Sequence, residues 1–376
     1  MNEDKATRYH RLRRRAGALS AGVAAALQLA LIVSGGSVAL RALAVDAATG
    51  VTLAAVLTPW LALVIYVVLL AALHELAVLP IAFYRGFVLE RRYGLSRETA
   101  RAWSRDHVKA SILGLAFGLA GAGLLYGLIH YRPSGWWVPA GIVFSLTTVA
   151  LAHLAPIVLL PIFYRVNPIT RHALRARLKA LVERAGTRVV GVYEWHLGDR
   201  TRRANAALVG LGRTRRILVS DTLLAEYSDE EVEAVLAHEI GHHVHRDIWR
   251  SIAYETALIF VGFLAAQRVL ETVAPRAGLT GPADIAGLPV VLLTVGVVSA
   301  VQMPLANALS RRQERRADQF ALALTGQPSA FVSAMRRLAA QNMAEDAPSR
   351  LVQALFHTHP PIRERIAEAS DAATSH

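Results

Sequence analysis

The pentapeptide His238-Glu239-Ile240-Gly241-His242 carries the residues in this chain whose spacing is most informative about chemistry. On a helix, residues four positions apart lie on one face, so both imidazoles can bind a single zinc ion. Glu239 then lies close enough to accept a proton from an attacking water, as in zinc peptidases. The alternative is a pair of surface histidines on an ordinary helix.

The residues that precede this motif predict a helix. Ser228 and Glu231 have the spacing of a capping box, and apolar residues at 232, 235, 236 and 240 recur at helical intervals. The two histidines therefore lie well inside a predicted helix, which favours the metal site.

A catalytic zinc ion needs a third protein ligand and one open position. The chain contains no cysteine, so this ligand must be a histidine or a carboxylate. Glu314 and Asp318 share a helix face just after an apolar run. We expect Glu314 to bind one Zn²⁺ per chain and Asp318 to accept the outer N–H of a ligating imidazole. The alternative is that both only neutralise neighbouring arginines.

Several other ionisable residues have two interpretations each. His359 is a candidate donor to the oxyanion of peptide hydrolysis. Asp247 either contacts the metal site or forms an ion pair with Arg246 or Arg250. His243 and His245 are more readily explained as exposed or helix-capping residues than as ligands.

His74 and Glu75 lie within an apolar segment, where ionisable groups are costly and often mark a cavity. They either line such a cavity, or Glu75 pairs with a neighbour on its own helix.

The composition predicts an integral membrane protein. Of the 376 residues, 54% are hydrophobic and 18% are charged, and the mean hydropathy is +0.36. This is too apolar for an ordinary soluble protein. Six segments are long enough to cross a bilayer, at residues 17–43, 51–84, 110–130, 136–164, 252–273 and 285–309.

The net charge of +13 is explained by the positive-inside rule rather than by nucleic acid, since no nucleic-acid motif is visible. Arginines precede the first span and fill the loop 85–109, the region 165–250 and the tail from residue 311. Both termini and the metal motif are therefore predicted to face the cytoplasm. The basic residues before the long first span indicate a retained anchor rather than a cleaved signal peptide.

Two domains are predicted. Residues 1–165 form an N-terminal membrane domain with four transmembrane helices and the cytoplasmic loop. Residues 166–376 form a metallopeptidase domain with the metal motif, a transmembrane hairpin at 252–309 and a tail that carries Glu314 and Asp318. The fold class is mostly α, a polytopic helical membrane protein with a small α+β zincin-like domain on its cytoplasmic side.

Three short apolar runs, at residues 189–193, 204–209 and 216–219, have strand character, with Gly210 and Gly212 between the last two. They predict a small antiparallel sheet beside the metal-binding helix. Its edge strand could pair with an extended peptide substrate.

The set of motifs, in this order, resembles the type 1 CAAX prenyl endopeptidases, which are integral-membrane zinc proteases. The resemblance covers roughly residues 80–366. The matching pieces are residues 84–95, Leu160-Pro161-Ile162-Phe163, Asn205-Ala206, residues 216–224, the HExxH motif, residues 310–318 and His359-Pro360-Pro361.

The resemblance implies a function and roles for individual residues. In that family the counterpart of Glu314 is the third zinc ligand, and the counterparts of Asn205 and His359 contact the substrate backbone. The helices enclose a water-filled chamber, and the substrates are prenylated CAAX proteins. The Ala- and Arg-rich composition indicates a bacterial member in the inner membrane. Whether its peptide or protein substrate is prenylated, and its oligomeric state, are left open.

Two other functions share some of these sequence features. A heat-shock-type quality-control metalloprotease also has HExxH and a helical hairpin, but has two spans before the motif where this chain has four. A transporter or a metal-binding membrane scaffold is expected to show inverted repeats with broken helices, which are not evident.

Overall fold

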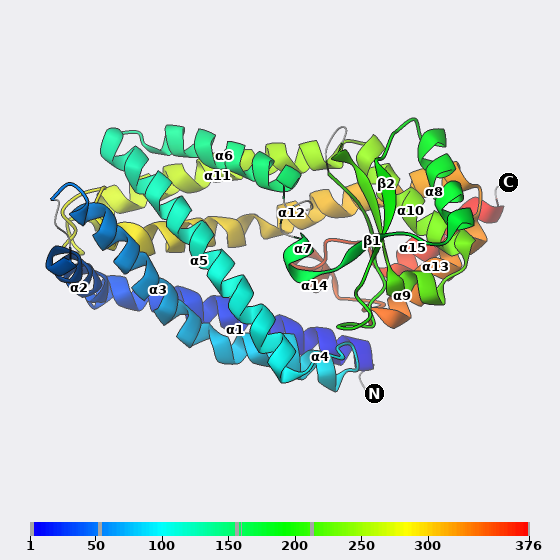
Figure 1. The fold of residues 1–376 in the computed structure, drawn as a ribbon, viewed down its shortest axis with the longest axis horizontal. Helices are drawn as coiled ribbons and strands as arrows, with labels where there is room; N and C mark the ends of the chain where they lie inside the picture. Colours follow the sequence, from blue (N-terminus) through cyan, green and yellow to red (C-terminus); the bar gives the residue numbers. More distant parts are fainter. Residues whose placement is uncertain (1–3, 52–54, 155–157, 159, 211–213, 375–376) are drawn as a thin grey trace.

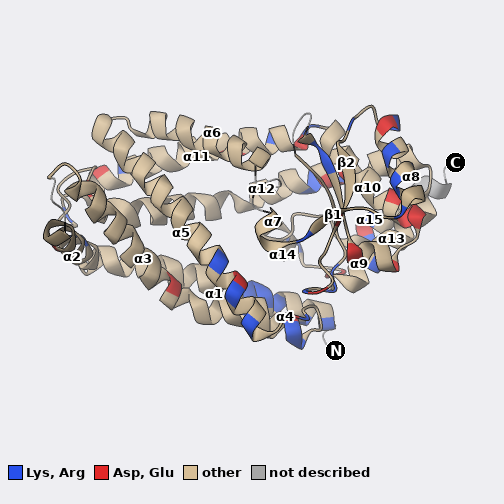
Figure 2. Ribbon diagram, viewed as in Figure 1, with Lys and Arg blue, Asp and Glu red and all other residues tan. Residues whose placement is uncertain are grey.

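The computed structural model describes residues 4–51, 55–154, 158, 160–210 and 214–374. A long bundle of helices forms one part of the molecule, and a smaller domain that contains the sheet lies at one end of it (Figure 1). Charged residues are concentrated in that domain and in the adjoining helix ends, whereas most of the bundle is uncharged (Figure 2). This distribution supports the predicted division into a membrane part and a polar part.

Six helical segments within the described residues are long and apolar enough to cross a membrane, as predicted. They contain α1 (Lys5–Val33), α3 (Thr58–Phe83), α5 (Ala100–Tyr131), α6 (Trp137–Leu154), α11 (Asp247–Val273) and α12 (Leu288–Thr325), the last preceded by the 3₁₀ turn η4 (Ile285–Gly287).

The predicted first span, residues 17–43, was wrong in its bounds. Helix α1 ends at Val33, and α2 (Gly36–Val51) follows after a turn. Gly35 lies in this turn with φ of +72°, a conformation that glycine adopts without a steric penalty. Because the residues on both sides of the turn are apolar, hydropathy alone joined two helices into one span.

The predicted cytoplasmic loop 85–109 is mostly helical. Helix α3 continues through the π-helical turn η1 (Tyr84–Val88) into α4 (Leu89–Arg92), and α5 begins at Ala100. Arg97 lies between α4 and α5, and the other arginines of this segment lie on helices that extend beyond the apolar segments.

The predicted fourth span, residues 136–164, lies partly outside the described residues. Helix α6 is described over Trp137–Leu154 and the short α7 over Leu160–Phe163, while residues 155–157 and 159 are not described.

The sheet has four strands, in the order β1-β2-β4-β3. Strands β2 and β4 pair in parallel, while the β1–β2 and β3–β4 pairs are antiparallel, so the prediction of a purely antiparallel sheet was wrong. Gly210 has φ of +87° in the β3–β4 connection, as expected of a turn, and Gly212 lies outside the described residues. The strands are β1 (Val166–Pro168), β2 (Gly191–Trp195), β3 (Ala206–Val209) and β4 (Arg216–Ser220).

The metal-motif helix α10 (Asp229–Val244) lies in the core of the polar domain. The predicted capping box is present, since Ser228 Oγ accepts the Glu231 N–H at 3.3 Å and Glu231 Oε2 accepts the Ser228 N–H at 2.9 Å. Leu236 and Ile240 are fully buried in the domain's apolar cluster. The other helices of this domain are α8 (His172–Arg184), α9 (Asp221–Glu226), α13 (Pro328–Gln341), α14 (Arg350–Phe356) and α15 (Ile362–Thr374).

Candidate metal centre and active site

A close approach of α10 and α12 brings the two halves of the candidate site together. A Cβ atom added to Gly241 would lie 3.0 Å from Ala317 Cα and 3.2 Å from its carbonyl oxygen. Glycine therefore allows the two backbones to approach more closely than a larger residue would. Helix α12 has 38 residues and extends from the bundle into the polar domain, so it carries Glu314 to the histidines.

His238, His242 and Glu314 form a cluster whose ligand atoms all lie within 4.8 Å of one another. The Nε2 atoms of the two histidines are 3.2 Å apart. Each of them lies 3.3 Å from a carboxylate oxygen of Glu314. Two imidazole nitrogens and a carboxylate thus converge on one point, as the ligands of a metal ion do.

The outer nitrogens of both imidazoles contact carboxylates. His238 Nδ1 lies 2.8 Å from Asp318 Oδ1, and His242 Nδ1 lies 3.1 Å from Asp247 Oδ2. These contacts favour hydrogen on Nδ1, so each Nε2 would be the nitrogen available to a bound metal ion.

Each of these supporting carboxylates also binds arginine. Asp318 accepts two hydrogen bonds from Arg365, at 2.6 and 2.7 Å. Asp247 Oδ1 accepts from Arg250 at 3.1 Å and from Arg316 at 2.6 Å. The two interpretations of Asp247 are therefore both realised, since it contacts His242 and pairs with Arg250.

The electrostatics of the cluster favour a bound cation. Burial lowers the pKa of His238, but hydrogen bonds to Asp318 and Glu314 outweigh burial and raise the pKa to about 9. Glu314 is buried, and its Oε2 lacks a hydrogen bond of good geometry within the described residues. A buried carboxylate oxygen without a hydrogen bond is costly, and a metal ion would satisfy it. The residues present therefore fit a metal.

Glu239 lies beside the cluster on the same helix. Burial raises the pKa of this carboxyl group, and the positive charge on the two neighbouring histidines lowers it by less. A carboxylate with a raised pKa is a better proton acceptor near neutral pH than an exposed glutamate is.

The structure brings His359 to the cluster from the segment between α14 and α15. Its Nε2 lies 3.3 Å from Glu314 Oε1, although the side chain is largely exposed. An imidazole that is both exposed and next to the metal ligands can reach a bound substrate.

Asn205 is not joined to the cluster by a hydrogen bond or ion pair among the described residues. Its backbone pairs with Ser220, and it directly precedes β3, which forms one edge of the sheet. Its side chain is exposed there.

The remaining histidines of the motif region lie outside the metal cluster. His245 is the C-cap of α10, and His243 is half-buried.

His74 and Glu75 line an apolar cavity of about 890 Å³ among the bundle helices. Glu75 Oε1 contacts His107 Nε2 of α5, so its partner lies on another helix rather than on its own.

Sequence reasoning gave no role to Arg365 or Arg316. Both act on the site through tertiary contacts: Arg316 binds Asp247, and Arg365 binds Asp318 and lies 3.4 Å from His238 Nδ1. Arg365 follows His359 closely in the sequence, but spacing alone does not identify its partner.

Comparisons with known proteins match this chain to families of membrane metallopeptidases. The model of peptidase family M48 matches residues 168–373, and the model described as the CAAX prenyl protease N-terminal domain, with five membrane helices, matches residues 2–165. Four helices of that region are long and apolar enough to cross a membrane. Helix α2, with 16 residues, is an additional helix there but is shorter than those four.

Individual proteins similar to this chain are also named as metalloproteases or CAAX prenyl proteases. An uncharacterized metalloprotease, YhfN, of Bacillus subtilis is 28% identical over 317 residues, which cover 83% of this chain and 74% of the relative. CAAX prenyl protease 1 of Saccharomyces cerevisiae is 26% identical over 320 residues, or 79% of this chain and 70% of the relative. The crystal structure of Ste24p from S. mikatae has the same fold, with a TM-score of 0.83 and 22% identity over 96% of this chain and 87% of that one.

Proposed function

Since this chain belongs to peptidase family M48 and is a membrane metalloprotease of the CAAX prenyl protease type, we propose that it cleaves peptide bonds near the C-terminus of extended peptides. Prenylated CAAX-type proteins are the first substrate class to test, because several relatives are named CAAX prenyl protease 1. The observation that carries the proposal is the convergence of His238, His242 and Glu314 on one point.

Zinc is the metal that this ligand set fits best, at one ion per chain. Two neutral imidazoles and one carboxylate, without thiolates, are a common set of ligands for catalytic zinc. When bound there, zinc supplies a Lewis acid that polarises the scissile carbonyl and makes water a better nucleophile. Asp318 and Asp247 hold the two imidazoles in the tautomer and orientation that this binding needs.

Glu239 is the proposed general base. It accepts a proton from the attacking water and delivers it to the leaving amine. Burial raises the pKa of this carboxyl group, which makes the carboxylate a better proton acceptor than an exposed glutamate. His359, exposed beside Glu314, is placed to donate a hydrogen bond to the oxygen that becomes negative.

The edge strand β3 is the proposed docking strand for substrate. It packs beside α10, and its outer side forms one edge of the sheet. An extended peptide added to this edge would run past the metal ligands, and Asn205 at the start of β3 would contact its backbone. The basic residues around the polar domain support a cytoplasmic site.

The test compares wild type with Glu239→Gln on a farnesylated CAAX peptide and on the same peptide without the prenyl group. We expect Glu239→Gln to lower the rate by about 10²–10⁴-fold. Equal rates for the two proteins would contradict the role of Glu239, and equal cleavage of both peptides would remove the prenyl group from the proposal.

A further inference from the structure

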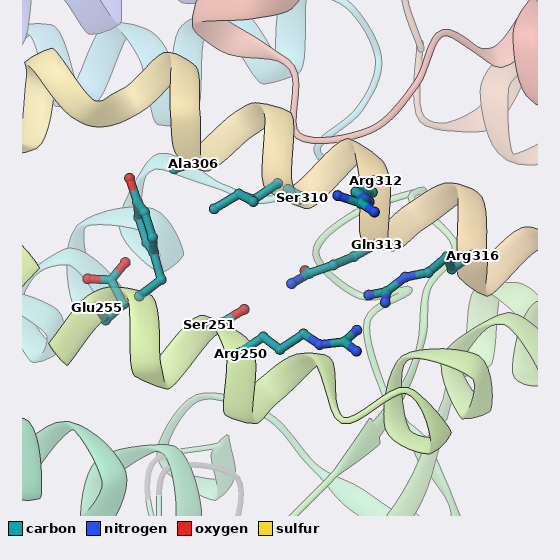
Figure 3. Close-up of a pocket in the computed structure, with 10 residues that line it drawn as sticks. Arg250, Ser251, Glu255, Ala306, Ser310, Arg312, Gln313 and Arg316 are labelled. Atoms are coloured by element: carbon teal, nitrogen blue, oxygen red, sulfur yellow. The ribbon is translucent and has the colours of Figure 1, made fainter. Parts of the chain in front are cut away.

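A cleft of about 560 Å³ lies between α11 and α12 (Figure 3). Its walls combine basic and hydroxyl groups with apolar ones. Among them are Arg250, Arg312, Arg316, Ser251, Tyr254 and Leu309.

The cleft lies at the level where both helices leave their apolar segments. Residues 252–273 of α11 and 288–309 of α12 each span roughly 33 Å, close to the thickness of a bilayer core of about 30 Å. Arg250 and Arg312 lie within one helical turn of the ends of these segments. Arginines at this depth face the phosphates of lipid headgroups, and basic pockets between membrane helices bind anionic headgroups.

The arginines of the cleft have donor groups to spare. Within residues 4–374, apart from the gaps stated above, Arg312 makes no hydrogen bond or ion pair, and its side chain is exposed. Arg316 lines the cleft, its side chain is 31% exposed, and among the same residues it binds Asp247 through Nη2. Glu255 lies at the opposite end of the cleft (Figure 3), so it does not neutralise this pair.

An exposed apolar stripe leads along α12 to the arginines. Val297, Val301, Leu305 and Leu309 recur every four residues and are 54%, 76%, 56% and 39% exposed. Residues at this spacing share one helix face. Trp249, which is 50% exposed next to Arg250, is a residue type that concentrates at membrane interfaces.

We propose that this cleft binds the phosphate of an anionic phospholipid from the membrane leaflet next to the polar domain. Arg312 and Arg316 donate to the phosphate oxygens, and an acyl chain lies along the stripe that ends at Leu309. Inorganic phosphate shares the headgroup chemistry but lacks the chain, so the two sources can be told apart. The inference does not depend on the substrate of the protease.

The test measures lipid binding to the full-length protein in detergent by native mass spectrometry. Phosphatidylglycerol and phosphatidylcholine of the same chain length are compared, and inorganic phosphate is added as a competitor. We expect one phosphatidylglycerol to bind at least about tenfold more tightly than phosphatidylcholine, with each tenfold equal to about 1.4 kcal/mol. Inorganic phosphate should compete poorly.

Arg312→Gln is the informative variant, because Arg250 and Arg316 also hold Asp247. It should lose about tenfold in affinity for phosphatidylglycerol, whereas Arg336→Gln, an exposed arginine on α13, should not. Leu305→Ser on the stripe should weaken binding of the lipid as well.

Equal binding of the two lipids would overturn the proposal. So would wild-type affinity in Arg312→Gln. Competition by inorganic phosphate at the affinity of the lipid would assign the cleft to free phosphate instead.

Discussion

Buried polar side chains have different interaction partners in the polar domain and in the membrane bundle. Around the metal cluster, buried carboxylates such as Asp247 and Asp318 each bind a histidine and at least one arginine. In the bundle, buried polar side chains such as Gln28 and Ser145 are uncharged, and each has an oxygen without a hydrogen bond partner in the described residues. The apolar spans rely on packing, while the site relies on matched charges; the buried Asp284, which pairs with Arg41, lies between two spans at the end of the bundle.

This difference matters because α12 belongs to both regions. Its apolar part exposes Val301 and Leu305 on one face of the bundle, and its last turns bury Glu314 and Asp318 against α10. Changes at the two ends of one helix should therefore have very different effects on metal binding.

The largest effect is expected from Glu314→Ala. This change removes a proposed ligand and leaves the two imidazoles without their carboxylate, so metal affinity should fall by more than about 100-fold, beyond the loss typical of outer-shell residues. Chelator competition measures it. Glu368→Ala, an exposed glutamate on α15, is the matched control and should bind metal as wild type does. Wild-type affinity in Glu314→Ala would refute the ligand assignment.

Asp318→Asn should have the next largest effect. Loss of the charge weakens the contact with His238 and leaves Arg365 without its anionic partner. Metal affinity should fall by about 10–100-fold, the range for a residue that orients a ligand. The same chelator titration measures this loss of metal affinity. An unchanged affinity would mean that Asp318 stabilises the fold of the domain without orienting a metal ligand.

Gly241→Ala tests the contact between the two helices. The added Cβ would lie 3.0 Å from Ala317 Cα, tighter than ordinary Cβ contacts, so the backbones of α10 and α12 must shift apart by a few tenths of an ångström. We expect a loss of about 1–3 kcal/mol in the free energy of unfolding, together with weaker metal binding.

Gly114→Ala on α5 is the control for this change, since no atom lies within 4 Å of its added Cβ. There the greater helix propensity of alanine should stabilise the protein by about 0.5–1 kcal/mol. If both variants behaved alike in denaturant unfolding, the close approach at Gly241 would not be what holds the site.

The smallest effect is expected from Leu146→Ala on α6. This leucine is 64% exposed on the bundle, so the change should alter stability by no more than about 0.5 kcal/mol and leave metal binding as it is. A clear loss of metal in a chelator titration would show that packing in the membrane bundle affects the metal cluster in the polar domain, contrary to this expectation.

The features of the site that could be predicted are those with local causes. The capping box at Ser228 and the four-residue spacing of the histidines fix the motif on one helix face. The choice of Glu314 needed chemistry as well as pattern, because a zinc site without cysteine requires a carboxylate or histidine on another element.

The features that could not be predicted depend on long-range contacts or on a local break in uniform hydropathy. Strands β2 and β4 pair in parallel although β3 lies between them in the sequence, and no turn residue in the sequence indicates this pairing. Gly35 ends α1 within an apolar stretch, where hydropathy does not change. Arg365 reaches Asp318 only once α15 has packed against α12.

X-ray absorption at the zinc edge of the purified protein tests the central claim most directly. The account predicts one zinc per chain with two imidazole nitrogens at about 2.0–2.1 Å and a carboxylate oxygen at about 2.0–2.2 Å. In Glu239→Gln the same spectrum should persist although hydrolysis is lost. A third imidazole in place of the carboxylate, or zinc bound with wild-type coordination in Glu314→Ala, would contradict it.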